Sequence, residues 1–348
     1  MRICGKSTTE KILIIAELSA NHGNDINIAK KTIDAIKESG ADFVKIQTYT
    51  PDTITLDVDN KYFRINQGTL WDNRTLYDLY SEAYMPWEWT EKLFEYCASI
   101  NLPIFSSPFD FTAVDLLEEL HTPAYKIASF EITDIPLIEY AASKMKPMII
   151  STGIADEEDI RRALKACHDV GNYDVVLLKT TSAYPANIED ANLLTMADYK
   201  KKFDVEFGLS DHTMGFIVPV VSVGMGARII EKHFILDKSI GGPDAEFSMS
   251  PKDFKQMVEQ VRLAEKAVGI VDHSLTEKKL KNRKFARSLF VAEDIKVGEI
   301  FNDTNVRSVR PSDGLPPRFL KNVIGKKATR DLSKGTPLKT NDIEGWNI

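Results

Sequence analysis

Two histidines, two lysines and two glutamates stand at or near the ends of short apolar segments in this sequence. The polar residues at these ends are Glu17, Lys45, Gln47, Ser107, Lys126, Ser129, Glu131, Ser151, Ser182, Ser210, His212 and His233. Side chains of these types can hold a metal ion, bind an anion or transfer a proton. If one fold brings the segment ends together, they form a catalytic site.

The histidines give the sharpest signal for a metal ion. His212 and His233 end successive apolar segments, so their imidazoles can converge on one cation. Two imidazoles completed by water and substrate oxygens suit Mn²⁺, Zn²⁺, Fe²⁺ or Co²⁺. A lone histidine is more often a core or hydrogen-bonding residue, but two at neighbouring strand ends favour a metal site. Asp211 is an alternative ligand, or a hydrogen-bonding partner of one.

The two lysines, Lys45 and Lys126, allow three interpretations. In the first, their ammonium groups and nearby hydroxyls form a cradle for phosphate and carboxylate groups. The hydroxyls are those of Ser129, Ser151, Ser182 and Ser210. In the second, one lysine forms a Schiff base with a carbonyl substrate, as in class I aldolases. In the third, each lysine forms only a structural ion pair with Glu17 or Glu131. The number of hydroxyls favours the cradle.

The glutamates Glu17 and Glu131 are expected to face the same cavity as the lysines. Pairing with positive charges predicts that both are ionised. Glu131 is the better placed of the two as a general base or a group that orients water. Glu17 is better suited to bind substrate hydroxyls. The structural alternative for Glu131 is an ion pair with Lys126.

Eight apolar segments must position these residues. They are rich in Ile, Val, Leu and Phe, as buried parallel strands are, and span residues 12–18, 43–49, 103–108, 124–131, 147–153, 175–182, 205–211 and 228–234. Strand and helix alternating eight times predict an α/β fold, the (β/α)₈ TIM barrel, whose catalytic groups lie at the carboxyl ends of the strands. The two-residue period of a strand places Ser129 and Glu131 on one face.

Helical patterns separate most of these segments. They span residues 27–41, 87–100, 112–121, 156–171, 216–227 and 250–269. The connection at 50–86 is longer than a minimal barrel needs and is rich in Tyr, Trp and Asp. Loops of that length at an active-site end usually carry substrate contacts or a lid.

The composition changes after Gly269, which predicts a second domain. We expect a barrel domain at 1–270, a charged linker at 271–285 and a C-terminal domain at 286–348. The last contains a weak repeat, residues 292–306 against 329–343, in which Asp-Ile or Asp-Leu precedes a glycine turn. The repeat predicts a small β-rich unit of about 60 residues with internal pseudo-symmetry, near the lower limit for independent stability.

The bulk composition narrows the class of protein. The chain has 348 residues, 43% of them hydrophobic, a net charge of −7 and a pI of about 5.5. This balance argues against nucleic acid or an anionic membrane as the main partner. The three scattered cysteines form no disulfide or metal-binding pattern. We find no secretory signal and no apolar run approaching ~20 residues, so we expect a cytoplasmic protein.

Short motifs along the chain resemble those of the sialic acid synthases, the nonulosonic acid synthase family. In the barrel region they are AELSANHGND (16–25), VKIQTYTPD (44–52), FSSPFD (105–110), YKIASFE (125–131), STGIA (151–155), TSAYPA (181–186), GLSDH (208–212), EKHF (231–234) and GGPDAEFSM (241–249). Residues 286–299 and 309–315 resemble the C-terminal antifreeze-like, or SAF, domain of that family. The resemblance covers nearly the whole chain, in order.

Within the family, the insertion at 68–89 and the motif TSAYP are most similar to the branch that makes pseudaminic acid. The N-acetylneuraminate synthases typically have Asn-Thr before Tyr-Pro, where this chain has Ser182 and Ala183. The resemblance implies condensation of phosphoenolpyruvate with the open-chain aldehyde of an acetamido sugar, with release of phosphate by C–O cleavage. For this branch the sugar is 2,4-diacetamido-2,4,6-trideoxy-L-altrose, and the product serves to glycosylate flagellin or a surface polysaccharide.

The resemblance also implies roles for individual residues. His212 and His233 would hold a divalent metal, expected to be Mn²⁺ with Mg²⁺ or Co²⁺ as alternatives, and Glu131 would orient the attacking water. Phosphate would be held by Lys45, Lys126, Ser151, Ser182 and Ser210. The carboxylate would be held by Ser107, where many relatives have Thr, and by Ser129. The sugar would be held by Glu17, Gln47, Tyr184 and Asp244.

One further residue implies an oligomer. Arg310 matches a family residue that the SAF domain of the other subunit delivers, which implies a domain-swapped homodimer with a shared active site. Three alternatives stay open: an N-acetylneuraminate or legionaminic acid synthase, a Schiff-base lyase, and a carbohydrate-binding protein with an inactive barrel. The intact set of strand-end residues counts against the last.

Overall fold

Eight parallel strands close into a barrel in the computed structural model, which describes residues 1–347. The barrel strands are β3 (Leu13–Glu17), β4 (Phe43–Thr48), β5 (Ile104–Pro108), β6 (Tyr125–Ile127), β7 (Met148–Ser151), β8 (Val175–Thr180), β9 (Glu206–Asp211) and β10 (Ile229–His233). Each strand pairs with the next, and β10 pairs with β3 to close the barrel. The predicted TIM barrel is confirmed. It belongs to the first of two units, Met1–Gly269, and the second begins at Ile270.

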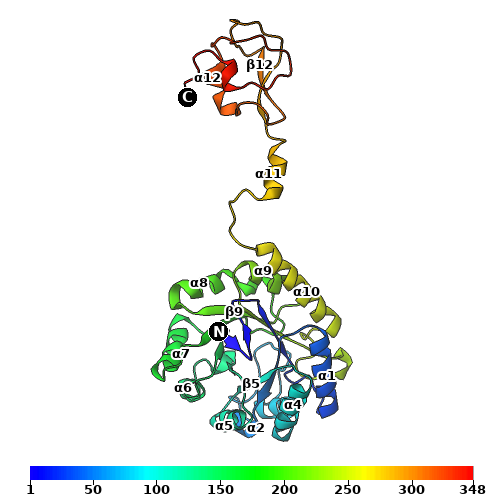
Figure 1. Ribbon diagram of the computed structural model, residues 1–348. Helices are drawn as coiled ribbons and strands as arrows, with labels where there is room; N and C mark the ends of the chain where they lie inside the picture. Colours follow the sequence, from blue (N-terminus) through cyan, green and yellow to red (C-terminus); the bar gives the residue numbers. More distant parts are fainter. Residues whose placement is uncertain (348) are drawn as a thin grey trace. The chain divides into compact units, whose positions relative to one another are not determined.

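Helices surround the strands of the first unit, as Figure 1 shows. They are α1 (Ile26–Glu38), α4 (Trp87–Ser99), α5 (Phe111–Glu119), α6 (Ile135–Ser143), α7 (Glu157–Asp169), α8 (Leu194–Phe203), α9 (Ile217–Gly224) and α10 (Pro251–Val268). The Ser250 side chain caps α10 by accepting a hydrogen bond from the Asp253 amide, and Gly269 ends it at φ +55°. None of the helices within residues 1–347 is long and apolar enough to cross a membrane.

The alternation of side chains along each strand decides which residues face the inside of the barrel. Leu13 and Ile15 of β3 belong to the buried cluster that also contains Phe43, Phe105 and Ile229. The opposite faces pack outward, because Ile14 and Ile230 belong to a different cluster, shared with the helices. The next inward positions beyond the interior cluster are therefore the polar ones: Glu17, Lys45, Gln47, Ser107, Glu231 and His233.

The fourth barrel strand is shorter than the sequence predicts. Strand β6 ends at Ile127, and Ser129–Glu131 form a 3₁₀ turn. The Glu131 amide donates to the Ala128 carbonyl at 3.2 Å, and the Glu131 carbonyl accepts from the Asp134 amide at 2.9 Å. The chain is already turning toward α6 here, so the two-residue strand period assumed for Ser129 and Glu131 was wrong.

The amino-terminal segment and the long insertion add local structure to the barrel. Strands β1 (Arg2–Ile3) and β2 (Lys6–Ser7) form a hairpin, and Ile3 joins the interior cluster. The insertion at 50–86 contains α2 (Pro51–Ile54), α3 (Leu76–Ala83) and a bridge between Arg64 and Thr75. Leu79 is buried, whereas Tyr62 is 77% exposed.

The second unit is held by a small core of its own. Its regular elements are α11 (Glu277–Arg283), β11 (Ser288–Val291), β12 (Val306–Val309) and α12 (Leu320–Val323), with β11 and β12 antiparallel. Its buried cluster includes Leu289, Val291, Phe301, Val323 and Leu338.

The sequence repeat in this unit is reproduced in its hydrogen bonds. Ile295 and Leu332 exchange two backbone hydrogen bonds, each of 2.9 Å. The Val297 amide donates to Asp331 at 2.9 Å, and the Lys334 amide donates to Asp294 at 2.8 Å. These are equivalent positions of the two copies, so the predicted pseudo-symmetry is confirmed.

Candidate active site

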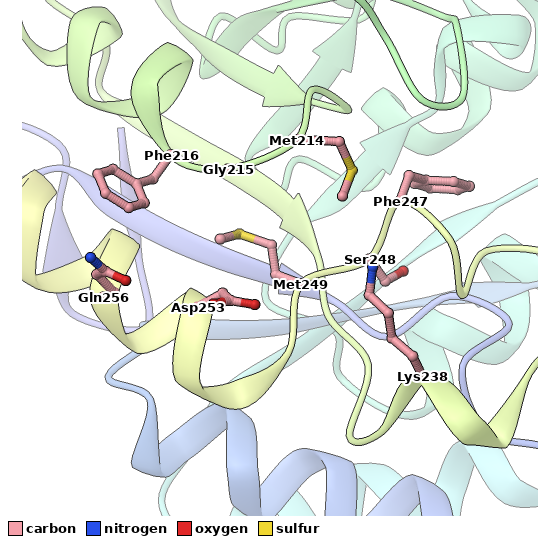
Figure 2. A pocket seen from close by; sticks show the side chains of 9 residues that line it. All are labelled: Met214, Gly215, Phe216, Lys238, Phe247, Ser248, Met249, Asp253 and Gln256. Atoms are coloured by element: carbon pink, nitrogen blue, oxygen red, sulfur yellow. The ribbon is translucent and has the colours of Figure 1, made fainter.

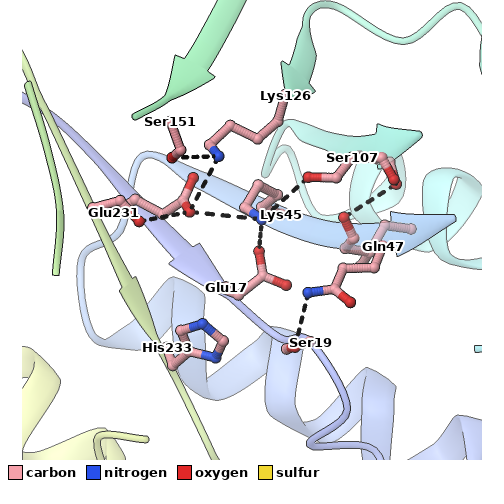
Figure 3. A network of polar contacts seen from close by, with 12 residues as sticks. Glu17, Ser19, Lys45, Gln47, Ser107, Lys126, Ser151, Glu231 and His233 are labelled. Atoms are coloured by element: carbon pink, nitrogen blue, oxygen red, sulfur yellow. Dashed lines mark hydrogen bonds and ion pairs between the residues drawn. The ribbon is translucent and has the colours of Figure 1, made fainter. Parts of the chain in front are cut away.

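Four charged side chains form one buried network at the carboxyl ends of the barrel strands, as Figure 3 shows. Lys45 Nζ forms an ion pair with Glu17 Oε2 and lies 3.6 Å from Glu231 Oε1. Lys126 Nζ lies 3.9 Å from the same Glu231 oxygen. Each of the four side chains is at most 5% exposed. Two buried positive charges therefore share two negative ones, with Glu231 between the lysines.

Serine hydroxyls surround the two ammonium groups. Lys126 Nζ donates to Ser151 Oγ at 2.7 Å, and Lys45 Nζ donates to Ser107 Oγ at 3.4 Å (Figure 3). Ser210 Oγ donates to Glu231 Oε1 at 3.2 Å. The structure thus brings together positive charge and hydroxyl donors in the manner that binds phosphate and carboxylate groups.

The hydroxyl groups of Ser129 and Ser182 both lie close to Gly153. A Cβ atom added to Gly153 would lie 2.0 Å from Ser182 Oγ and 2.7 Å from Ser129 Oγ. The Gly153 amide donates to Ser129 Oγ at 3.2 Å, whereas Ser182 Oγ is buried without a hydrogen-bond partner in the structure. A side chain at position 153 would displace these hydroxyls, so glycine is needed there for both to reach the site.

Burial controls the protonation of the site carboxyls and amines. It raises the pKa of both Glu17 and Glu131 to about 7, although nearby lysines oppose the shift. It lowers the pKa of Lys126 to about 8. Burial would also raise the pKa of Glu231, but the Lys126 and Lys45 ammoniums hold it below its ordinary value. Desolvation therefore opposes the ionisation that charge pairing favours in Glu17 and Glu131.

Glu131 is not the ion-pair partner of Lys126. Within residues 1–347, Glu131 forms no ion pair, and Lys126 pairs with Glu231 instead. One carboxylate oxygen of Glu131, Oε2, is buried without a hydrogen-bond partner among these residues. A buried and unsatisfied carboxyl group with a pKa near 7 is suited to hold a water molecule or exchange a proton.

The two predicted metal ligands lie side by side. The ring centroids of His212 and His233 are 5.3 Å apart. His212 Nδ1 lies 2.9 Å from the Thr181 carbonyl, which can only accept, so Nδ1 carries the proton and Nε2 keeps a free lone pair. His233 Nδ1 is buried without a hydrogen-bond partner in the structure and lies 3.7 Å from Asp244 Oδ2.

Both imidazoles are held neutral, the form that binds a metal. Burial lowers the pKa of His212 to about 4, and burial together with the neighbouring His212 lowers the pKa of His233 well below its ordinary value. Across residues 1–347, no group of three or more His, Cys, Asp or Glu side chains is arranged to hold a metal ion. The structure therefore offers a pair of imidazoles with an orphaned buried nitrogen, and this donor set fits a divalent cation.

Asp211, the alternative ligand, is used elsewhere. Its carboxylate accepts hydrogen bonds from Lys232 Nζ, the Thr213 amide and Thr213 Oγ1. Lys232 lies between Glu231 and His233 on β10, so it faces away from the barrel interior. The structure assigns Asp211 to the outer face and removes it from the set of candidate ligands.

The residues expected to hold a sugar form a second hydrogen-bonded group. Gln47 Nε2 donates to Ser19 Oγ at 3.0 Å, and Ser19 Oγ donates to Asp244 Oδ2. Tyr184 packs on His212 with ring centroids 4.4 Å apart. Arg310 lies in the second unit, directly after β12, where it is exposed and lines a pocket of about 410 Å³.

Three residues of the site were not assigned from the sequence. Glu231 stands two residues before His233 on β10, so the strand period already placed it on the inner face. Ser19 and Phe247 lie in loops, where no periodic pattern identifies them. The Phe247 ring is 4.9 Å from that of His233 and also lines a hollow of about 150 Å³ (Figure 2). Met214, Phe216 and Lys238 are among the other side chains around that hollow.

Paired lysines, carboxyls, hydroxyls and imidazoles at the carboxyl ends of closed parallel strands define a (β/α)₈-barrel enzyme. Residues 32–273 match the model of the NeuB family, and residues 286–344 match that of the SAF domain. The chain belongs to the NeuB family and is an enzyme of that family of synthases.

Similar proteins span nearly the whole chain. The chain is 51% identical to the pseudaminic acid synthase of Helicobacter pylori over 332 residues, covering 95% of this chain and 97% of that protein. It is 49% identical to the pseudaminic acid synthase of Campylobacter jejuni serotype O:23/36, covering 99% and 100%. The crystal structure of an N-acetylneuraminic acid synthetase from Leptospira borgpetersenii, in complex with citrate, has a TM-score of 0.70 and 30% identity, covering 78% of this chain and 90% of that one.

Proposed function

We propose that this chain condenses phosphoenolpyruvate with 2,4-diacetamido-2,4,6-trideoxy-L-altrose and water to give pseudaminic acid and phosphate. The observation that carries the proposal is identity of 49–51% to pseudaminic acid synthases over 95% or more of the chain. The network around Lys45 and Lys126 supports it, because phosphoenolpyruvate needs sites for one phosphate and one carboxylate.

The anion cradle divides between the two ends of phosphoenolpyruvate. The phosphate would be held by Lys45, Lys126, Ser151, Ser182 and Ser210. The carboxylate would be held by Ser107 and Ser129. Because Ser182 Oγ has no hydrogen-bond partner within the described chain, a phosphate oxygen would satisfy it. The Schiff-base alternative is less favoured, since Lys45 is tied to Glu17 and Lys126 to Ser151 and Glu231.

His212 and His233 would hold a divalent metal, which we propose is Mn²⁺ with Mg²⁺ or Co²⁺ as alternatives. Their neutral rings and the unpartnered His233 Nδ1 fit such an ion. When bound, the ion supplies Lewis acidity at an aldehyde oxygen. The protein's part is to place the sugar aldehyde against the enol carbon of phosphoenolpyruvate, using Gln47, Asp244, Glu17 and Tyr184 around the sugar.

Glu131 would govern the step that releases phosphate. The C=C π electrons of phosphoenolpyruvate form a bond from C3 to C1 of the sugar. The C1=O π bond opens, its oxygen takes up a proton, and C2 becomes electron-deficient. Glu131 orients a water molecule toward C2 and accepts one of its protons, for which a pKa of about 7 is well matched. The bond from C2 to the phosphate oxygen then breaks, and the C2 hydroxyl becomes the ketone of the product.

We also propose that the enzyme is a domain-swapped homodimer in the cytoplasm. Arg310 would reach the sugar in the active site of the partner subunit from the SAF domain. Exposure of Arg310 on the second unit leaves its guanidinium available for such a contact. Nucleic acid and membrane play no part in this proposal.

The test is an end-point assay with phosphoenolpyruvate, Mn²⁺ and three separate sugars. These are the L-altrose derivative, 2,4-diacetamido-2,4,6-trideoxy-D-mannose and N-acetylmannosamine, with products identified by mass spectrometry. We expect pseudaminic acid from the first sugar only. Product from either other sugar instead would make the chain a legionaminic or N-acetylneuraminic acid synthase with the same mechanism.

A separate experiment tests the Schiff-base alternative. Borohydride added during turnover should leave the protein mass unchanged, because the proposed chemistry forms no bond between substrate and lysine. A stable adduct on Lys45 or Lys126 would support the lyase instead. A folded protein that yields neither product nor adduct would favour the carbohydrate-binding alternative.

A further inference from the structure

The long insertion at 50–86 brings the side chain of Trp71 to the candidate active site. The Trp71 ring centroid lies 5.7 Å from that of Tyr184, and Tyr184 lies 4.4 Å from His212 and 5.2 Å from Phe247. Phe247 in turn lies 4.9 Å from His233. We call Trp71, Tyr184 and Phe247 the aromatic wall. The wall starts at the two imidazoles and ends in the insertion.

The polar end of Trp71 is already occupied. Its indole Nε1–H donates to the Pro243 carbonyl at 3.2 Å, next to Asp244. Indole has no other hydrogen-bonding group, so the remaining surface of Trp71 is apolar. Trp71 is only half-buried, which leaves part of that surface open. Trp71 can therefore contact a methyl group favourably but offers nothing to a hydroxyl group.

The length of the sugar brings its far end to Trp71. This step rests on the proposed function, which places the sugar aldehyde carbon beside His212 and His233. A six-carbon chain extends about 6 Å from first to last carbon, given bonds of roughly 1.5 Å. Between ring centroids, Tyr184 lies 4.4 Å from His212, and Trp71 lies 5.7 Å from Tyr184. A sugar that follows the wall therefore ends between Tyr184 and Trp71.

The last carbon of the proposed sugar is a methyl group, because the sugar is 6-deoxy. N-acetylmannosamine and other ordinary hexoses carry a hydroxymethyl group at the same place. We propose that the aromatic wall receives the C6 methyl group, and that Trp71 is a specificity-determining residue that favours 6-deoxy sugars over 6-hydroxy sugars. A 6-hydroxyl group against the Trp71 ring would lose its water without gaining a partner from the indole, whose N–H is already bound to Pro243.

The experiment compares two substrates that differ only at C6. They are the 6-deoxy L-altrose derivative and its 6-hydroxy counterpart, 2,4-diacetamido-2,4-dideoxy-L-altrose. The selectivity is the ratio of their kcat/KM values. In Trp71→Ala the selectivity should fall about 10-fold or more, because kcat/KM should decrease for the methyl-bearing substrate alone. The KM for phosphoenolpyruvate should stay within about twofold of the wild-type value, since the Trp71 side chain bonds to Pro243 and packs on Tyr184 rather than on a residue proposed to hold the anion.

Two further variants separate recognition from structural support. Trp71→Phe keeps an apolar ring but loses the hydrogen bond to Pro243, and its selectivity should stay within about threefold of wild type. Tyr62→Ala removes another aromatic ring of the same insertion, one that is 77% exposed, and should change nothing. Unchanged selectivity in Trp71→Ala would overturn the proposal. So would equal selectivity losses in Trp71→Phe and Trp71→Ala, because the hydrogen bond and not the wall would then be responsible.

A binding measurement keeps this inference separate from the proposed function. The alditols obtained by reducing the two sugars cannot react, and calorimetric titration gives their affinities directly. The wild-type protein should prefer the 6-deoxy alditol, and Trp71→Ala should lose about 10-fold of that preference. If the wild type turns over neither sugar, the proposed function fails. The preference between the two alditols still shows whether the aromatic wall recognises the C6 methyl group. The proposal would be overturned if the wild type showed no preference for the 6-deoxy alditol. It would also be overturned if Trp71→Ala kept the wild-type preference.

Discussion

At the scale of single residues, the buried network sets the pH range in which the site can work. Lys126 is sealed from water, and its pKa of about 8 means that it loses its charge just above neutral pH. Glu131 has a pKa of about 7, so it becomes a neutral acid just below neutral pH. In the proposed mechanism, Lys126 must be protonated to bind the phosphate and Glu131 must be deprotonated to accept a proton from water.

This arrangement predicts a narrow bell-shaped dependence of kcat/KM for phosphoenolpyruvate on pH. Activity should fall as pH drops through about 7, where Glu131 becomes protonated, and as pH rises through about 8, where Lys126 becomes neutral. Lys126→Arg should move the alkaline limb upward, because a guanidinium stays charged. In the residual activity of Glu131→Gln the acid limb should disappear. An acid limb that persists there would point to Glu17, whose pKa is also about 7, and would contradict the assignment.

The identities of the site residues could be predicted from the sequence wherever strand periodicity applied. Glu17, Lys45, Gln47 and His233 all occupy inward positions near strand ends, where the two-residue period placed them. The protonation of Glu17 and Glu131 could not be predicted, because it depends on how much water the fold excludes. The position of Glu231 between two lysines is likewise a property of barrel closure, since it comes from the pairing of β10 with β3 and β9.

At the scale of elements, one ion pair joins the ends of the two strands that carry the histidines. Lys232 Nζ on β10 contacts Asp211 Oδ2 on β9, and both side chains are at most 3% exposed. Lys232 precedes His233 and Asp211 precedes His212. The Lys232–Asp211 ion pair faces outward from the barrel, whereas the imidazoles lie inside. The ion pair therefore fixes the spacing of the two histidines from the outer face of the strands.

Lys232→Met should therefore loosen the histidine pair. Removing one partner of a buried ion pair costs about 3–5 kcal/mol of stability, and loss of a supporting contact lowers metal affinity about 10–100-fold. Calorimetric Mn²⁺ titration and chemical unfolding would measure the two effects. Lys6→Met is the matched control, because Lys6 also pairs with a buried carboxylate, that of Asp42, but at the opposite, amino-terminal end of the barrel strands. Equal Mn²⁺ affinity in Lys232→Met and wild type would show that the pair does not position the histidines.

Some of the secondary-structure elements could be predicted from the sequence and others could not. The eight strands were recognisable because buried parallel strands are almost continuously apolar. Strand β6 was overestimated, since Ser129–Glu131 directly follow its apolar residues in the sequence but form a 3₁₀ turn. The contact of Trp71 with Pro243 joins segments far apart in the chain, and no local pattern signals such a pairing.

At the scale of the whole molecule, the proposed exchange of SAF domains can be tested by measuring the activity of two co-expressed variants. Lys126→Ala should inactivate the barrel, and Arg310→Ala should inactivate the partner's site while leaving its own barrel intact. If domains are exchanged, a mixed dimer contains one fully wild-type site. Co-expression of the two variants should restore about a quarter of wild-type activity, because half of the dimers are mixed and half of their sites are complete. Activity no higher than the average of the separate variants would rule out the exchange.

The matched hydrogen bonds of the second unit also make its two halves depend on each other. Ile295 and Leu332 pair with each other, and Asp294 and Asp331 cap each other's turns, so each half supplies what the other lacks. Neither half therefore keeps its turn without the other, so the two halves should unfold together. Arg310 lies between the two copies, outside the repeated residues. The segment that carries Arg310 is thus anchored at both ends in one cooperative unit.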